Sequence, residues 1–312
     1  MSAPKQARFL VLRGGAIGDF ILTLPAIQAL RDRWPDAYIE LIGYPHIANL
    51  ALAAGLVDHV DSLDRAETAR LFTWRPSFSE AQAEHLRSFD VILSYLHDPD
   101  GVVMANLKSA GVKQVLYGSP LVETGHAIEH LMKPLETLAI YSEHPAPRLV
   151  LDASRGREWL DAHGLSGNAV AIHPGSGSPK KNWPAESFIR LAEQLKASGQ
   201  PYLMIFGEAD GAAAEAIRGS LPGMIDLSGC TLVELASVLS ACRAYVGNDS
   251  GVTHLAAALG LRTIVMFGPS DAERWGPRGS HVRVIKAPGG KLDCFSITDV
   301  LNMLPPPSSS SS

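Results

Sequence analysis

Residues 247–260, Gly-Asn-Asp-Ser-Gly-Val-Thr-His-Leu-Ala-Ala-Ala-Leu-Gly, have the pattern of a strand end, a tight turn and a helix start. The apolar residues 244–246 predict a buried strand before the turn, and the Ala- and Leu-rich residues 255–259 predict a helix after it. Asp249 or Ser250 would cap this helix, and the N–H groups at its start would attract a phosphate. A capped helix without a ligand shows the same residues, so this stretch alone leaves both interpretations open.

A second apolar run, residues 263–267, leads into the loop Gly268-Pro269-Ser270. Two parallel strands end at the same edge of their sheet, and open α/β sheets bind ligands at that edge. We therefore expect this loop to lie beside the turn at 249–252.

The rest of the chain alternates between short apolar runs and helical patterns, which predicts parallel sheets with crossover helices. Further strands are expected at 8–12, 38–42, 57–63, 89–94, 114–117, 169–172, 202–206 and 224–227. Further helices are expected at 46–54, 78–88, 99–109, 126–139, 154–163, 184–198, 210–218, 231–240 and 296–304, and one follows residue 17.

Two segments of the first half each allow two interpretations of their secondary structure. The helix after residue 17 contains Pro25, so it either starts near Pro25 or is kinked there. Residues 64–77 have no clean period and form either a mobile substrate loop or a surface helix.

The length of 312 residues fits two α/β domains of about 150 residues each. Residues 141–151 lose the periodicity and contain two prolines, which indicates a linker. We therefore predict an N-terminal lobe at 1–145, a C-terminal lobe at 146–304 and a disordered Pro- and Ser-rich tail at 305–312.

The composition excludes several classes of protein. Lys and Arg total 27 and Asp and Glu total 32, so the net charge of −5 gives no general attraction to nucleic acid. No apolar run suggests a signal peptide or a membrane span. Cys230, Cys242 and Cys294 lack metal-ligand spacing. We expect a cytoplasmic protein that binds no metal.

The loop Arg13-Gly14-Gly15-Ala16-Ile17-Gly18-Asp19 follows the first predicted strand. A dinucleotide fingerprint ending at Gly18 needs glycine where Arg13 stands, which disfavours a nicotinamide enzyme. Asp19 can cap the following helix or act as a base toward a ligand, and the residues alone favour the cap.

A third loop, residues 173–184, follows the predicted strand 169–172 and precedes a helix that starts near Pro184. It is rich in hydrogen-bond donors and carries Lys180 and Lys181, which would suit a diphosphate. An exposed loop with solvated lysines is the alternative.

Together these loops resemble glycosyltransferase family 9, whose best-known members are the ADP-heptose:lipopolysaccharide heptosyltransferases. The resemblance rests on residues 13–19 followed by Leu22-Thr23-Leu24-Pro25-Ala26, on Lys181-Asn182-Trp183-Pro184, and on residues 249–258 with Phe267-Gly268-Pro269. It implies a GT-B fold, in which two Rossmann-like lobes with parallel sheets face each other across a cleft. It also implies an inverting reaction that needs no metal and no cofactor beyond a nucleotide-sugar donor.

The resemblance further implies roles for single residues. Asp19 corresponds to the catalytic base and Lys181 to the lysine that contacts phosphate and assists catalysis. The expected donor-binding residues are Ser176, Lys181, Asp210, Asp249, Ser250, Gly251, Val252 and His254, and the expected acceptor-binding residues are Arg13, Gly18 and His126. Glu208 is the second choice to Asp210 for holding the nucleoside, and surface solvation is the alternative for Asp210. A core role is equally open for His254.

The implied function is transfer of a heptose or related sugar from an ADP-sugar to an acceptor of the lipopolysaccharide-core type. The expected partners are the nucleotide sugar, a glycan or lipid-linked saccharide, and peripherally the inner membrane surface, but not nucleic acid. Two alternatives are a GT-B transferase with another donor and a cell-surface glycan acceptor, and a sugar-nucleotide-binding protein that has lost catalysis.

Overall fold

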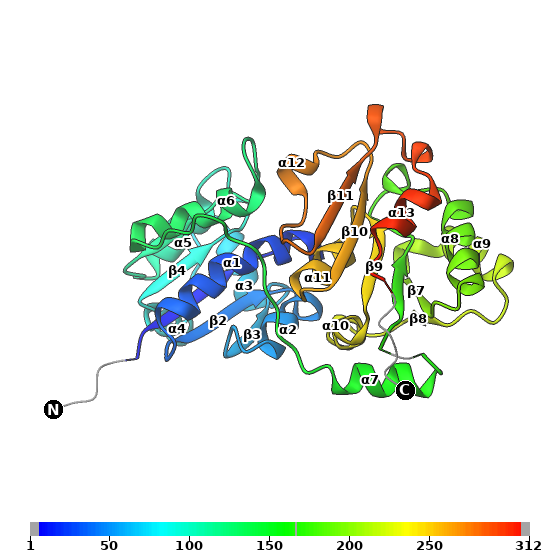
Figure 1. Ribbon diagram of the computed structural model, residues 1–312. Helices are drawn as coiled ribbons and strands as arrows, with labels where there is room; N and C mark the ends of the chain where they lie inside the picture. The colour runs from blue at the N-terminus through cyan, green and yellow to red at the C-terminus, as the bar shows by residue number, and fades with distance from the viewer. Residues whose placement is uncertain (1–5, 166, 307–312) are drawn as a thin grey trace. The chain divides into compact units, whose positions relative to one another are not determined.

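The computed structural model describes residues 6–165 and 167–306. The chain divides into two compact units, Met1–Pro147 and Arg148–Ser312, and this division falls within the stretch 141–151. Each unit contains one parallel β-sheet with helices packed on it (Figure 1). Only Pro305 and Pro306 of the predicted tail are among the described residues, so the disorder prediction for 307–312 falls outside them.

The N-terminal unit has a five-stranded sheet in the order β3-β2-β1-β4-β5. Its strands are β1 (Arg8–Leu12), β2 (Tyr38–Gly43), β3 (His59–Ser62), β4 (Val91–Ser94) and β5 (Val115–Tyr117). The apolar run of β1 pairs with β2 on one side and β4 on the other, so Leu10 and Leu12 are fully buried. The strand order reverses between β1 and β4, and such a reversal creates a ligand-binding crevice at the carboxyl ends of the strands.

The helices of this unit are α1 (Ile17–Arg33), α2 (Pro45–Ala53), α3 (Ala66–Ala69), α4 (Glu80–Arg87), α5 (Val102–Ser109) and α6 (Ala127–Met132), with 3₁₀ helices η1 (Arg70–Phe72) and η2 (Lys133–Leu138). Helix α1 runs through Pro25, so the alternative that the helix starts near Pro25 is wrong. The predicted helix 126–139 changes to η2 at Lys133, because Pro134 has no N–H for an α-helical bond. Short helical turns, α3 and η1, occupy part of residues 64–77.

The C-terminal unit has a six-stranded sheet in the order β11-β10-β9-β6-β7-β8. Its strands are β6 (Val170–His173), β7 (Tyr202–Phe206), β8 (Asp226–Ser228), β9 (Ala244–Asn248), β10 (Arg262–Phe267) and β11 (Val282–Lys286). The strand order reverses between β6 and β9, which end at His173 and Asn248. Strand β11 was not predicted, because this edge strand is mostly exposed and has no clear apolar alternation.

The helices of this unit are α7 (Ser154–Ala162), α8 (Ala185–Ala197), α9 (Gly211–Ser220), α10 (Leu232–Ala241), α11 (Gly251–Ala258), α12 (Ala272–Trp275) and α13 (Ile297–Met303), with 3₁₀ helices η3 (Pro179–Lys181), η4 (Glu208–Asp210), η5 (Pro288–Gly290) and η6 (Leu292–Cys294). Helix α8 buries Phe188, Leu191 and Leu195, which recur at helical spacing, in the core. Among the described residues, no helix combines the length and the apolar character needed to cross a membrane.

Candidate functional site

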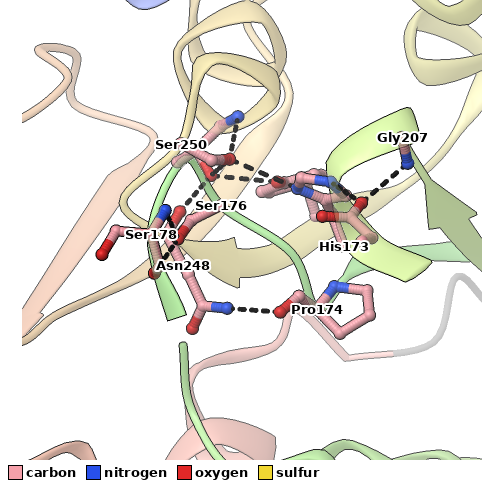
Figure 2. Close-up of polar contacts among 10 residues, drawn as sticks. His173, Pro174, Ser176, Ser178, Gly207, Asn248 and Ser250 are labelled. Atoms are coloured by element: carbon pink, nitrogen blue, oxygen red, sulfur yellow. Dashed lines mark hydrogen bonds and ion pairs between the residues drawn. The ribbon is translucent and has the colours of Figure 1, made fainter. Parts of the chain in front are cut away.

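The candidate donor site lies where the strand order of the C-terminal sheet reverses. Asn248, at the end of β9, is fully buried and holds both ends of the loop that follows β6. Its Nδ2 donates to the carbonyl oxygen of Pro174 at 2.7 Å (Figure 2). Its Oδ1 accepts from the N–H of Trp183 at 2.9 Å. The lysine-bearing loop is therefore fixed to the strand that leads into the phosphate-binding turn.

Lys181 reaches that turn directly. Its Nζ lies 2.8 Å from Oδ2 of Asp249, and the same oxygen accepts a hydrogen bond from the Ser270 hydroxyl at 2.6 Å. The Lys181 side chain keeps 36% of its surface exposed, whereas that of Asp249 keeps 8%. The position of Ser270 confirms that the loop after β10 lies beside the turn. Three loops that are distant in sequence thus meet around one carboxylate.

Ser250 caps helix α11, as one of the two predicted caps. Its Oγ accepts a hydrogen bond from the N–H of Thr253 at 3.3 Å, whereas the N–H of Asp249 donates to Met266 of β10. Gly251 and Val252 occupy the first turn, where backbone N–H groups have no acceptor within the helix. His254 is buried in the same helix, and its N–H donates to the Ser250 carbonyl at 3.3 Å; its contact with the donor stays a prediction.

A buried histidine connects this helix start to the neighbouring strand. His173, the last residue of β6, lies between Ser250 and the loop at Gly207 (Figure 2). Its Nε2 is 3.0 Å from Oδ2 of Asp210, and its Nδ1 is 3.2 Å from Oγ of Ser250. A carboxylate can only accept, so Nε2 carries the proton; in the neutral ring Nδ1 then accepts the Ser250 hydroxyl proton. The His173–Asp210 pair thereby orients the side chain that caps α11.

The Asp210 carboxylate belongs to the interior of the unit. Its Oδ2 also accepts the N–H of Gly207 at 2.7 Å. Burial opposes ionisation, but the hydrogen bonds from His173 and Gly207 outweigh it and hold the pKa of Asp210 below its usual value. The alternative that Asp210 is a solvated surface residue is wrong, because only 6% of it is exposed. Its contact with a nucleoside stays a prediction.

Ser176 shapes the lysine-bearing loop from within. Its hydroxyl donates to the carbonyl oxygen of Ser178 at 2.8 Å and accepts the Ser178 N–H at 3.2 Å (Figure 2). Such side-chain bonds stabilise a local turn. If Ser176 also contacts the nucleotide sugar, as predicted, the same hydroxyl must bond to both the ligand and Ser178.

In the N-terminal unit, the predicted base Asp19 follows β1 at the reversal of strand order. It is the third residue of α1, and its Oδ2 accepts the N–H of Ala16 at 3.2 Å, so it contributes to the helix start. Its side chain is nevertheless 42% exposed, and Oδ1 lies 4.0 Å from the Arg13 guanidinium. A cap and a base are therefore compatible at this residue.

The predicted acceptor-binding residues lie at different depths of this unit. Arg13 is buried and donates to the carbonyl oxygens of Asp19 at 3.0 Å and Tyr95 at 3.5 Å. Burial lowers the pKa of Arg13, and the Asp19 carboxylate opposes this shift. Gly18 is the second residue of α1, and the buried His126 caps α6 by accepting the N–H of Ile128 at 3.1 Å. The acceptor roles of Arg13, Gly18 and His126 remain predictions.

Sequence reasoning singled out Lys181 and the turn at 249–252, which the structure brings together, but missed three partners. His173 joins Asp210 to Ser250, Asn248 joins the lysine-bearing loop to β9, and Ser270 bonds to Asp249. The sequence did contain one signal that could have identified these three residues. Each of them stands at or just beyond the carboxyl end of a predicted strand. Within residues 6–165 and 167–306, no group of three or more His, Cys, Asp or Glu side chains is placed to hold a metal ion.

Comparisons with known proteins point to one family. The model of glycosyltransferase family 9 (heptosyltransferase) matches residues 98–304. Lipooligosaccharide heptosyltransferase 2 of Haemophilus influenzae is 32% identical over 130 residues, which are 39% of this chain and 38% of that protein. Lipopolysaccharide heptosyltransferase 3 of Escherichia coli is 23% identical over 283 residues, which are 83% of this chain and 82% of that protein.

A solved structure shows the same fold. The Escherichia coli ADP-heptose lipopolysaccharide heptosyltransferase II superposes with a TM-score of 0.78 at 20% identity, and the match covers 95% of this chain and 97% of that chain. The predicted α/β class of GT-B type, with one parallel sheet in each of two units, is confirmed. Since the family model spans more than half of the sequence, the chain belongs to glycosyltransferase family 9, the heptosyltransferase family.

Proposed function

We propose that this chain transfers a heptose or related sugar from an ADP-sugar to an acceptor of the lipopolysaccharide-core type. In this proposal the anomeric carbon is inverted, and neither a metal nor a further cofactor takes part. The observation that carries the proposal is the position of Lys181, which is held by Asp249 directly before the start of helix α11.

An ammonium group beside a helix start suits a diphosphate. The N–H groups of Gly251 and Val252 and the positive end of the helix dipole favour an anion at the start of α11. Lys181 is one-third exposed, so its Nζ has donors left for a ligand beyond the bond to Asp249. Both groups would stabilise the charge that develops on the leaving diphosphate.

The relatives support the proposed nature of the donor. The solved Escherichia coli structure is named for ADP-heptose, which supports an adenine nucleotide carrying a heptose here. Both hydrogen bonds to Asp210 fall on Oδ2, which leaves Oδ1 as an acceptor for a ribose hydroxyl. The exposed Glu208 is the second candidate for this contact.

The acceptor hydroxyl would be activated by Asp19. Its half-exposed carboxylate takes the proton as the acceptor oxygen forms a bond to the anomeric carbon, and the bond from that carbon to the diphosphate breaks on the opposite face. ADP then leaves with the charge stabilised by Lys181 and α11. A lipid-linked acceptor would bring the protein to a membrane surface, so we include peripheral membrane contact in the proposal.

Calorimetry with ADP and with adenosine tests the donor site. Replacing Lys181 by Ala should weaken ADP binding by roughly 1–3 kcal/mol, the range for a charged hydrogen bond, and leave adenosine binding nearly unchanged. Lys180→Ala is the matched control, because this adjacent lysine is exposed, and it should change neither affinity. Equal losses of ADP and adenosine binding would remove Lys181 from the phosphate site. Turnover of ADP-heptose with a lipopolysaccharide-core acceptor then tests the reaction itself.

A further inference from the structure

Two large aromatic side chains on one short segment of the N-terminal unit point into solvent. Phe72, the last residue of η1, is 48% exposed, and Trp74, two residues later, is 72% exposed. Neither residue has a part in the sites described above. Neighbouring exposed aromatics on a folded surface are typical of interaction sites, since burying such rings is strongly favourable.

The backbone that carries these rings is fixed rather than loose. The buried amide of Asn106, in α5, donates from Nδ2 to the carbonyl oxygens of Leu71 at 2.9 Å and Thr73 at 2.8 Å. Leu71 is buried in the hydrophobic core, so Phe72 and Trp74 face away from it. The segment is thus anchored at Leu71 and Thr73, the residues that precede the two rings in the chain, and the exposure of both rings follows from this anchoring.

A positively charged side chain, Arg75, lies beside the Trp74 ring. The guanidinium of Arg75 lies 5.8 Å from the centroid of the Trp74 ring, within the range of a cation–π contact. Arg75 has a φ of 50°, a left-handed conformation that costs free energy for a residue with a side chain. The guanidinium of Arg70 is instead bonded within the protein, since its Nη1 donates to the Ser77 carbonyl and to Gln82. Arg75 is therefore the charge presented together with the indole.

We propose that Phe72, Trp74 and Arg75 form a membrane-contact surface that docks on a bilayer interface containing anionic phospholipid. Indole rings favour the boundary between headgroups and acyl chains, and a guanidinium is attracted to anionic headgroups. Asp64 and Glu67 lie close in sequence and oppose this attraction, so the two rings contribute most of the binding. The inference rests on the proposed function only for the choice of a membrane as partner.

Sedimentation with phospholipid vesicles tests this surface. The full chain is mixed with vesicles of phosphatidylcholine alone, or of phosphatidylcholine and phosphatidylglycerol in equal parts. The test variants are Phe72→Ser combined with Trp74→Ser, and Arg75→Gln. The control is Tyr141→Ser, which removes an aromatic ring of the same unit that is 75% exposed.

The partition coefficient of the Phe72→Ser/Trp74→Ser variant should fall about tenfold or more with both kinds of vesicle, because interfacial binding scales with buried apolar area. Arg75→Gln should weaken binding only to the anionic vesicles, and Tyr141→Ser should bind as wild type does. The proposal fails if the paired variant binds like wild type, or if wild type binds neither vesicle. It also fails if the paired variant keeps vesicle binding but loses affinity for a soluble core saccharide, which would make the rings a sugar site.

ADP binding separates this test from that of the proposed function. The donor-site residues belong to the C-terminal unit, so every surface variant should bind ADP as wild type does. Absence of ADP binding by the wild-type protein would count against the proposed function and would leave the vesicle result intact.

Discussion

Gly175 offers a sharp test of the His173–Asp210 pair. A Cβ atom at residue 175 would lie 1.6 Å from Oδ1 and 2.0 Å from Cγ of Asp210, so Gly175→Ala must displace this carboxylate. The displacement would break the bonds from His173 and Gly207. A hydrogen bond to a charged group contributes about 1.5–3 kcal/mol, and the buried carboxylate of Asp210 accepts two such bonds. We expect roughly 3 kcal/mol of lost unfolding free energy for Gly175→Ala and for Asp210→Ala alike.

The double variant Gly175→Ala/Asp210→Ala shows whether Gly175→Ala destabilises the protein through its clash with Asp210 or independently of that residue. Asp210→Ala removes the three atoms that lie nearest to the new methyl group, since all of them belong to the Asp210 carboxylate. Gly175→Ala should then add little, so the double variant should be about as stable as Asp210→Ala alone. This corresponds to a coupling free energy of roughly 3 kcal/mol between residues in contact.

Urea unfolding followed by tryptophan fluorescence, together with ADP titration, measures both effects. ADP affinity should fall in both single variants, because His173 no longer orients the Ser250 hydroxyl at the start of α11. Gly177→Ala is the matched control, since no atom lies within 4 Å of a Cβ at that residue of the same loop, and it should change stability by less than about 0.5 kcal/mol. Strictly additive losses, or a silent Gly175→Ala, would refute the reasoning.

Two further predictions concern the N-terminal unit. Asp19→Asn should lower the single-turnover rate by about two to four powers of ten with little change in melting temperature, because Asn can still accept the Ala16 N–H but cannot take a proton. A variant that keeps more than about a tenth of the wild-type rate would place the base elsewhere. The hydrogen bond that His85 Nε2 donates to Oε1 of Glu40, at 3.1 Å, raises the pKa of His85 despite the opposing effect of burial. A raised pKa in the folded state stabilises the protein below the unfolded value of about 6.5, and this contribution is lost as the pH rises through the folded pKa. Glu40→Gln should therefore lower the melting temperature more at about pH 6 than at about pH 9, and an equal or reversed difference would contradict the assignment.

Local patterns in the sequence determined most elements of both sheets. The apolar run of residues 8–12 and the helical spacing of residues 184–198 each fall on an observed element, because periodicity of burial is a local property. Ser250 was identified as a possible cap for the same reason, since a cap bonds to a residue only three positions ahead. The edge strand β11 was missed although Val282, Val284 and Ile285 are β-formers, because a run of five residues at an exposed edge shows no periodicity of burial.

The contacts that build the donor site were decided by the tertiary structure. Lys181 and Asp249 are 68 residues apart, and His173 and Ser250 are 77 residues apart. These residues meet because β6 pairs with β9, which places the carboxyl ends of two distant strands side by side. The order of strands in a sheet depends on the packing of the whole unit. A carboxylate such as Asp210 can therefore appear as a surface acid in the sequence and lie buried against His173 in the fold.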